Sequence, residues 1–212
     1  MNLEQFDLAI SKSEQGAELL LGLLETGHGR QAVLEDHARC LLQIAEIQLR
    51  RVSQDGIDDA VKQEALERAR TELNKTIPAF QELVQANPLV DRLHGQIAYI
   101  SEMRVDVEVL AGQLDAAEDC LSDFWAVVGA TPEKCNYRAE IGKAYFKSVA
   151  QVLKAMSGLS QPAAATTLRK VNADRVGNWV SQFPEDEELA SLQASFENAT
   201  TEGSDNEAEA KQ

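Results

Sequence analysis

The sequence predicts an all-α fold, an α-solenoid of antiparallel helix pairs, and three observations lead to it. Apolar residues recur in steps of three and four through seven or eight long segments. Glycines and prolines stand between these segments, where helices end and begin. A motif at 43–47 (Gln-Ile-Ala-Glu-Ile) returns at 96–100 and more loosely at 140–142, and such recurrence is typical of helical arrays. A compact up-down helical bundle is the alternative, because amphipathic segments of this kind also build bundles.

The composition narrows the class of protein. The chain has 212 residues and a net charge of −15, which disfavours nucleic-acid binding because phosphate groups would be repelled. No apolar run is long enough to cross a bilayer, and the acidic N-terminal sequence lacks the pattern of a secretory signal. Three widely spaced cysteines fit a reducing compartment. We therefore expect a cytoplasmic protein with neither a nucleic-acid nor a membrane partner.

The N-terminal half predicts four helices. They cover residues 3–26, 31–54, 57–86 and the stretch between Pro88 and Gly112. Pro78 lies inside the third and cannot donate to the carbonyl of Asn74, so we expect one bent helix. In the fourth, Val105, Val107 and Val109 alternate with charged residues in a strand-like period. Since no partner strand is evident nearby, we expect this stretch to be helical.

The C-terminal half continues the pattern. The fifth helix is predicted at 114–129, and the sixth opens at Pro132, carries Tyr137 on its apolar face and ends near Gly158. A seventh reaches residue 183. The predicted organisation is a flanking helix (1–30), three degenerate helix-pair repeats (31–183), a capping helix (184–199) and a disordered acidic tail (200–212).

Three short patterns mark the predicted junctions. They are 80–88 (Phe-Gln-Glu-Leu-Val-Gln-Ala-Asn-Pro) followed by Arg92 and Ile97-Ala98, 112–117 (Gly-Gln-Leu-Asp-Ala-Ala) followed by Leu121, and Tyr137-Arg138 with Ile141-Gly142 and Tyr145. These patterns resemble tetratricopeptide-like helix-pair repeats of the longer type, about 42–44 residues, associated with bacterial serine/threonine kinases. The resemblance spans 31–183 and is closest at 80–146. It implies that Gly112 makes an inter-helix turn, that Ala117 lets paired helices approach, and that the array binds a partner protein.

A local excess of positive charge suggests where a partner binds. The sixth helix carries a net charge of +3 across 133–154, within an acidic chain. In an array the first helix of each pair lines a groove, so Arg138, Lys143 and Lys147 could bind an acidic peptide. Arg39 and Tyr99 could face the same groove. The alternative is a solvated helix face that balances acidic neighbours in the same protein. We predict a non-catalytic interaction scaffold or adaptor.

Two matches to Glu/Asp-x-x-His raise the possibility of a di-metal helical enzyme, since residues three apart share a helix face. They are Glu25 with His28, interrupted by Gly27, and Asp91 with His94. Chance matches are expected in a chain with 35 acidic residues. We therefore predict no catalytic residue, no metal and no cofactor. A regulatory or accessory helical-bundle subunit and the di-metal enzyme remain the alternative functions.

Overall fold

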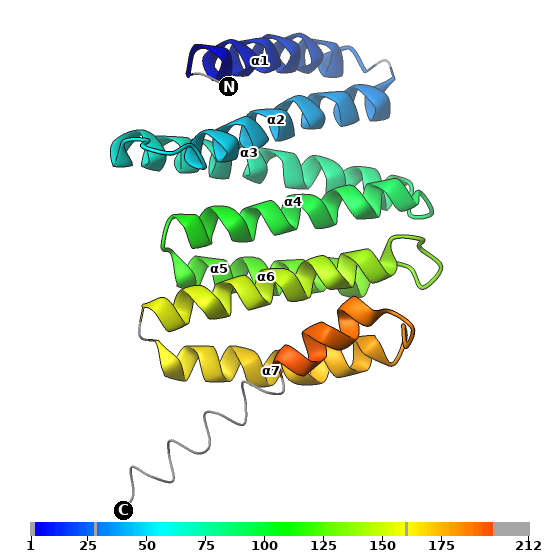
Figure 1. Cartoon of the computed structure of the whole chain (residues 1–212). Helices are drawn as coiled ribbons and strands as arrows, with labels where there is room; N and C mark the ends of the chain where they lie inside the picture. The colour runs from blue at the N-terminus through cyan, green and yellow to red at the C-terminus, as the bar shows by residue number, and fades with distance from the viewer. Residues whose placement is uncertain (1–2, 28, 160, 197–212) are drawn as a thin grey trace, which may run out of the picture.

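The computed structural model describes residues 3–27, 29–159 and 161–196, and in this part all regular secondary structure is helical (Figure 1). The predicted all-α class is therefore confirmed. A helical segment at 187–196 follows seven helices. These helices are α1 (Leu3–Glu25), α2 (Arg30–Val52), α3 (Asp59–Ala86), α4 (Asp91–Leu110), α5 (Leu114–Ala130), α6 (Arg138–Gly158) and α7 (Pro162–Val180).

The helices stack in one direction as an α-solenoid. Extensive packing joins each helix to the next one in the chain and also joins α4 to α6. A closed bundle would require extensive packing of α1 against the later helices, and within the described residues α1 packs extensively against α2 only. In Figure 1, α2, α4 and α6 form one layer, which we call the first-helix layer, with α3 and α5 behind it. The solenoid prediction is confirmed, and the compact-bundle alternative is wrong.

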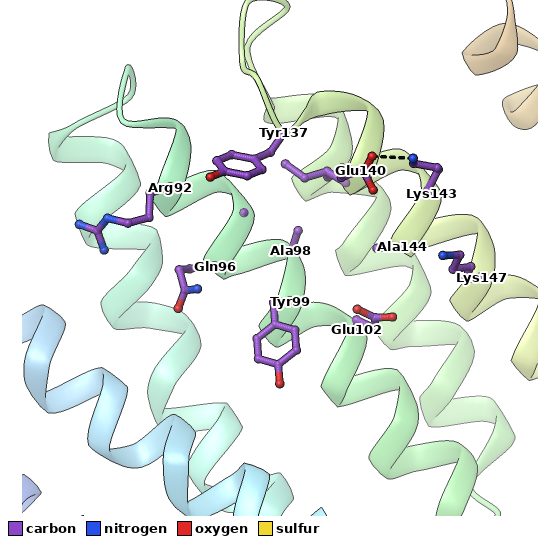
Figure 2. A pocket seen from close by; sticks show the side chains of 12 residues that line it. Arg92, Gln96, Ala98, Tyr99, Glu102, Tyr137, Glu140, Lys143, Ala144 and Lys147 are labelled. Atoms are coloured by element: carbon purple, nitrogen blue, oxygen red, sulfur yellow. Dashed lines mark ion pairs between the residues drawn. The ribbon is translucent and has the colours of Figure 1, made fainter. Parts of the chain in front are cut away.

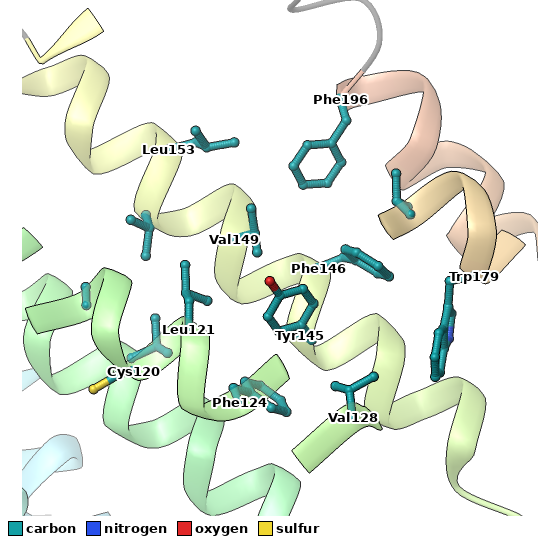
Figure 3. Packing of buried hydrophobic residues seen from close by; sticks show 14 of the residues in the cluster. Cys120, Leu121, Phe124, Val128, Tyr145, Phe146, Val149, Leu153, Trp179 and Phe196 are labelled. Carbon is teal, nitrogen blue, oxygen red and sulfur yellow. The ribbon is translucent and has the colours of Figure 1, made fainter. Parts of the chain in front are cut away.

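Buried apolar side chains form two main clusters that meet at α4. The first cluster contains residues of α2, α3 and α4. The second contains residues of α4, α5, α6, α7 and the 187–196 segment, as Figure 3 shows in part. Val105 belongs to the second cluster and Val107 to the first, and both are fully buried. The strand-like alternation in the sequence thus has a helical explanation. A helix with neighbours on several sides needs apolar residues around most of its circumference.

Local chemistry sets the ends of several helices. The Asp58 side chain accepts a hydrogen bond from the backbone N of Ala60 at 2.8 Å and caps α3. Gly112 has φ of 71° in the turn between α4 and α5, a conformation that is unfavourable for residues with a Cβ. Pro78 lies inside α3, which continues through it. The predicted single helix across Pro78 and the predicted Gly112 turn are both confirmed.

The start of the sixth helix was predicted wrongly. Residues from Pro132 to Tyr137 form turns, in which the backbone N of Cys135 donates to the carbonyl of Pro132 at 3.0 Å, and α6 begins at Arg138. As a result Tyr137 is 47% exposed and does not share the buried face of α6. Pro132 does mark the start of a new local structure, but that structure is a turn and not the first turn of a helix.

The pairing of α6 with α7 depends on a close approach. A Cβ at Gly142 would lie 1.9 Å from Nε1 of Trp179, so only glycine fits this position. Trp179 is 4% exposed and lies beside Phe183 with ring centroids 5.8 Å apart. The small residue in the third motif copy therefore serves the packing of α7.

The predicted tail at 200–212 lies outside the described residues, as does His28. Across residues 3–27, 29–159 and 161–196, no helix combines the length and apolar character needed to cross a membrane.

Candidate functional site

The repeated motif positions one side chain of each copy on the first-helix layer. In the two close copies the second, third and fifth residues are buried, namely Ile44, Ala45, Ile47, Ile97, Ala98 and Ile100. The fourth residue of each copy, Glu46, Tyr99 or Lys143, lines a surface hollow. The register that buries the apolar residues thus also sets which side chain of each copy lines a hollow.

A hollow of about 420 Å³ lies between α4 and α6, and we call it the α4–α6 hollow (Figure 2). Three of its lining residues are small: Gly95, Ala98 and Ala144. Two tyrosines also line it, Tyr99 at 41% exposure and Tyr137 at 47%. A hollow of this size falls within the range of ligand pockets and can accept an apolar side chain between two aromatic rings.

Polar contacts join α4 to α2 on one side of the hollow. Arg92 binds the Glu35 carboxylate through both terminal nitrogens, one at 3.1 Å, and this contact lowers the pKa of Glu35. Tyr99 donates from its hydroxyl to Oε1 of Glu46 at 3.1 Å. Burial, with a further contribution from Glu46, raises the pKa of Tyr99 to about 12. Tyr99 is therefore a neutral hydrogen-bond donor at physiological pH.

The predicted cations on α6 have partners within the chain. The ammonium of Lys143 lies 2.5 Å from Glu140, 3.1 Å from Asp186 and 3.5 Å from Glu188. Lys147 lies 2.6 Å from Glu188. The hydrogen bond that Lys143 donates to Glu140 is the main cause of the raised pKa of Lys143, whose side chain is only 10% exposed. Lys143 thus fits the alternative given above, in which the cations of the sixth helix balance acidic neighbours in the same protein. Lys147 also has an acidic neighbour, but its side chain is half-exposed.

The other two predicted residues lie elsewhere. Arg138 donates to the carbonyl of Thr131 and lies 5.0 Å from the ring centroid of Trp179, so it faces α7. Arg39 lies 2.8 Å from Glu35 and lines a neighbouring hollow formed mainly by α2, with one residue each from α1 and α4. The structure therefore brings Tyr99, Lys143 and Lys147 together at the α4–α6 hollow, places Arg39 beside it, and separates Arg138 from it.

Two half-buried carboxyl groups on α4 were missed from the sequence. Glu102 lines the hollow, and burial raises its pKa while Lys147 lowers it. Burial also raises the pKa of Asp106, which hydrogen-bonds Gln151 of α6. Their four-residue spacing placed them on one helix face, which was a usable signal. Their burial was not predicted, because the helix that covers this face, α6, is distant in the sequence. Tyr137 was missed because the helix start was placed too early.

The described part of the chain lacks the ligand cluster that the di-metal hypothesis requires. Among the described residues, no three or more His, Cys, Asp or Glu side chains gather in a way that could hold a metal ion. Asp91 accepts hydrogen bonds from the backbone N and side-chain Nδ2 of Asn136, at 3.1 and 2.6 Å. The ring Nε2 of His94 lies 2.9 Å from the carbonyl of Pro88. Asp91 and His94, the second Asp-x-x-His match, therefore each bond to a different part of the chain.

Comparison with known proteins gives only distant structural likenesses. No family model and no curated protein sequence matches the chain. The crystal structure of the de novo designed helical repeat protein DHR64 is 14% identical, covers 98% of each chain and gives a TM-score of 0.48. The DHF79 filament is 16% identical, covers 89% of this chain and 96% of its own, and gives 0.44. Neither likeness bears on function.

Proposed function

We propose that the protein is a non-catalytic interaction scaffold that binds a segment of another protein in the α4–α6 hollow. The observation that carries this proposal is the open hollow lined by small residues and by the exposed rings of Tyr99 and Tyr137. Tyrosines supply a large contact area at little cost in conformational entropy, and they are enriched in binding surfaces. Tyr99 projects from α4 and Tyr137 immediately precedes α6. A partner would therefore meet a largely preformed surface.

The chemistry of the hollow favours an extended peptide with one apolar side chain. That side chain would enter over Ala98 and Ala144, between the two rings. Of the two lysines that line the hollow, Lys147 is the more available to a nearby carboxylate, because in the described part of the chain it pairs with Glu188 alone whereas Lys143 has three acidic neighbours. We thus retain an acidic group in the partner as part of the proposal and assign it to Lys147. We propose neither a nucleic-acid nor a membrane partner.

The finer parts of the proposal come from the sequence resemblance. We infer that the array serves beside a bacterial serine/threonine kinase in the cytoplasm. Two placements support the resemblance: Gly112 lies in the α4–α5 turn, and Ala117 is fully buried on α5. The three cysteines are free thiols, in keeping with a reducing compartment. Co-purification of a kinase from bacterial cytoplasm, lost when the hollow is filled, would support this part.

Site-directed photocrosslinking tests the binding site. A photoreactive phenylalanine replaces Tyr99, and the full chain is irradiated in extract from the source cells. We expect covalent capture of one main protein, identified by mass spectrometry. Filling the hollow by Ala144→Leu should abolish this capture, because the added side chain occupies the space above α6.

The control places the same photoreactive residue at Val171, which is 47% exposed on α7, away from the hollow. Capture of the same protein at both positions, or capture unaffected by Ala144→Leu, would contradict the proposal. Circular dichroism of each variant establishes that the helices remain folded.

A further inference from the structure

The outer face of α1 carries an unpaired row of leucines. Phe6, Ile10 and Ala17 are buried on the face toward α2. On the opposite face Leu8 is 61% exposed and Leu19 is 72% exposed. At 100° per residue the outer row occupies an arc of about 80°. Its members, which we call the α1 stripe, are Leu8, Lys12, Gln15, Leu19 and Leu23.

The α1 stripe is free of carboxylates, although the chain has a net charge of −15. The described acidic side chains of α1 lie off the stripe, and two turn back to the same molecule. Asp7 pairs with Arg51 of α2, and Glu14 pairs with Arg68 of α3. A second copy of so acidic a chain is repelled by most of the surface. The stripe is a face where like-charged copies can meet.

The spacing along the stripe is self-complementary. Positions 8 and 23, and 12 and 19, are symmetric about a point next to Gln15. When a second α1 lies antiparallel across that point, Leu8 faces Leu23 of the other copy. Leu19 then faces the aliphatic stem of Lys12, whose ammonium can reach water. A two-fold axis requires this matching of a surface with itself.

We propose that two copies of the chain form a closed dimer through antiparallel packing of their α1 stripes. Among the described residues, the far end of the stack, formed by α7 together with the 187–196 segment, carries no comparable row of leucines, and Val171 is the one large apolar side chain exposed on α7. The exposed residues of the described 187–196 segment are polar or small, namely Glu187, Glu188, Ala190, Ser191, Ala194 and Ser195. A head-to-tail filament would bury leucines against this polar end, so the symmetric dimer is favoured. This inference is independent of the proposed function.

Analytical ultracentrifugation of the full chain tests the dimer. We expect a species of twice the 23.2 kDa chain mass at micromolar concentration. Leu8→Glu should raise the dissociation constant at least about tenfold, because a carboxylate would enter each of the two apolar contacts between Leu8 and Leu23. Leu89→Glu is the matched control, since Leu89 is 88% exposed in the turn before α4. A wild-type monomer at several hundred micromolar, or equal loss in both variants, would overturn the proposal.

Cysteine crosslinking tests the antiparallel register. Gln15→Cys should give a covalent dimer on mild oxidation, because the two positions meet at the axis. Leu8→Cys should not, since two such positions would be about 22 Å apart along antiparallel helices. Crosslinking at both positions would instead indicate parallel packing and overturn the proposed register.

Discussion

Tyr99 donates a hydrogen bond to Glu46 at 3.1 Å, and the two residues occupy the fourth position of successive motif copies. The contact therefore joins equivalent points of two neighbouring repeats. The third copy has Lys143 at this position, where it binds the acidic residues before and within the 187–196 segment. The fourth position of the motif thus supplies polar contacts between helices that are neighbours in the stack, while the residues beside it fill the core.

Gly142→Ala should destabilise the protein by about 2–3 kcal/mol, because the new methyl group would overlap the Trp179 indole. The measurement is chemical denaturation followed by tryptophan fluorescence. Gly158→Ala is the control in the same helix, since a methyl group added there would meet no neighbouring side chain within 4 Å. An unchanged midpoint for Gly142→Ala would mean that Trp179 has another accessible position.

Arg70→Met should lower the free energy of unfolding by about 2 kcal/mol. Arg70 holds the Glu108 carboxylate through two nitrogens, at 2.7 and 2.8 Å, and Glu108 is only 6% exposed. Its removal leaves a buried carboxylate without this partner. Arg68→Met, which breaks an exposed pair with Glu14, should cost about 0.5 kcal/mol or less.

The double variant of Arg70→Met with Glu108→Met separates the two explanations for such a loss. Recovery of most of the stability shows that the unpaired charge was responsible, because two apolar side chains can replace an ion pair. No recovery would assign the loss to packing around the arginine stem.

Lys143→Met should loosen the 187–196 segment by removing the cation shared by Asp186 and Glu188. Hydrogen exchange of that segment is the measurement, and faster exchange is expected at pH 7. Lys154→Met, on an exposed side chain of α6, provides the control. Equal exchange in both variants would show that Leu189 and Phe196, both buried, suffice to hold the segment.

The same contact should weaken in acid. Backbone hydrogen bonding from Leu189, followed by Lys143, lowers the pKa of Asp186, and Lys147 lowers that of Glu188. A carboxyl group with a lowered folded-state pKa stabilises the fold above its ordinary pKa, here 3.8 and 4.5, and loses this effect as pH falls through the lowered value. Protection of 187–196 should therefore fall below about pH 4 in the wild type. Lys143→Met should show a smaller change.

Asp106→Asn should raise the melting temperature at pH 7. Burial raises the pKa of Asp106, so the folded state binds the proton more tightly than the unfolded state. Ionised Asp106 thus costs stability above that pKa, and the difference between variant and wild type should disappear in acid. Asp55→Asn, in an exposed turn, is the control. A lower melting temperature at pH 7 would mean that the bond to Gln151 outweighs the cost of burial.

Local patterns in the sequence were sufficient for the helical fold. The burial of Ile44 and Ile97, the turn at Gly112 and the continuity of α3 through Pro78 all follow from residues close together in the chain. Two of the three acidic partners of Lys143, Asp186 and Glu188, could not be read in the same way. They lie more than forty positions later, and their approach depends on the stacking of α6, α7 and the segment that follows.

The shared position of α4 gives the array a mechanical property. Val105 and Val107 belong to different apolar clusters although they are two residues apart on α4. A rotation of α4 about its own axis would therefore disturb both interiors together. A force applied at α4 would for the same reason act on the packing of both clusters at once.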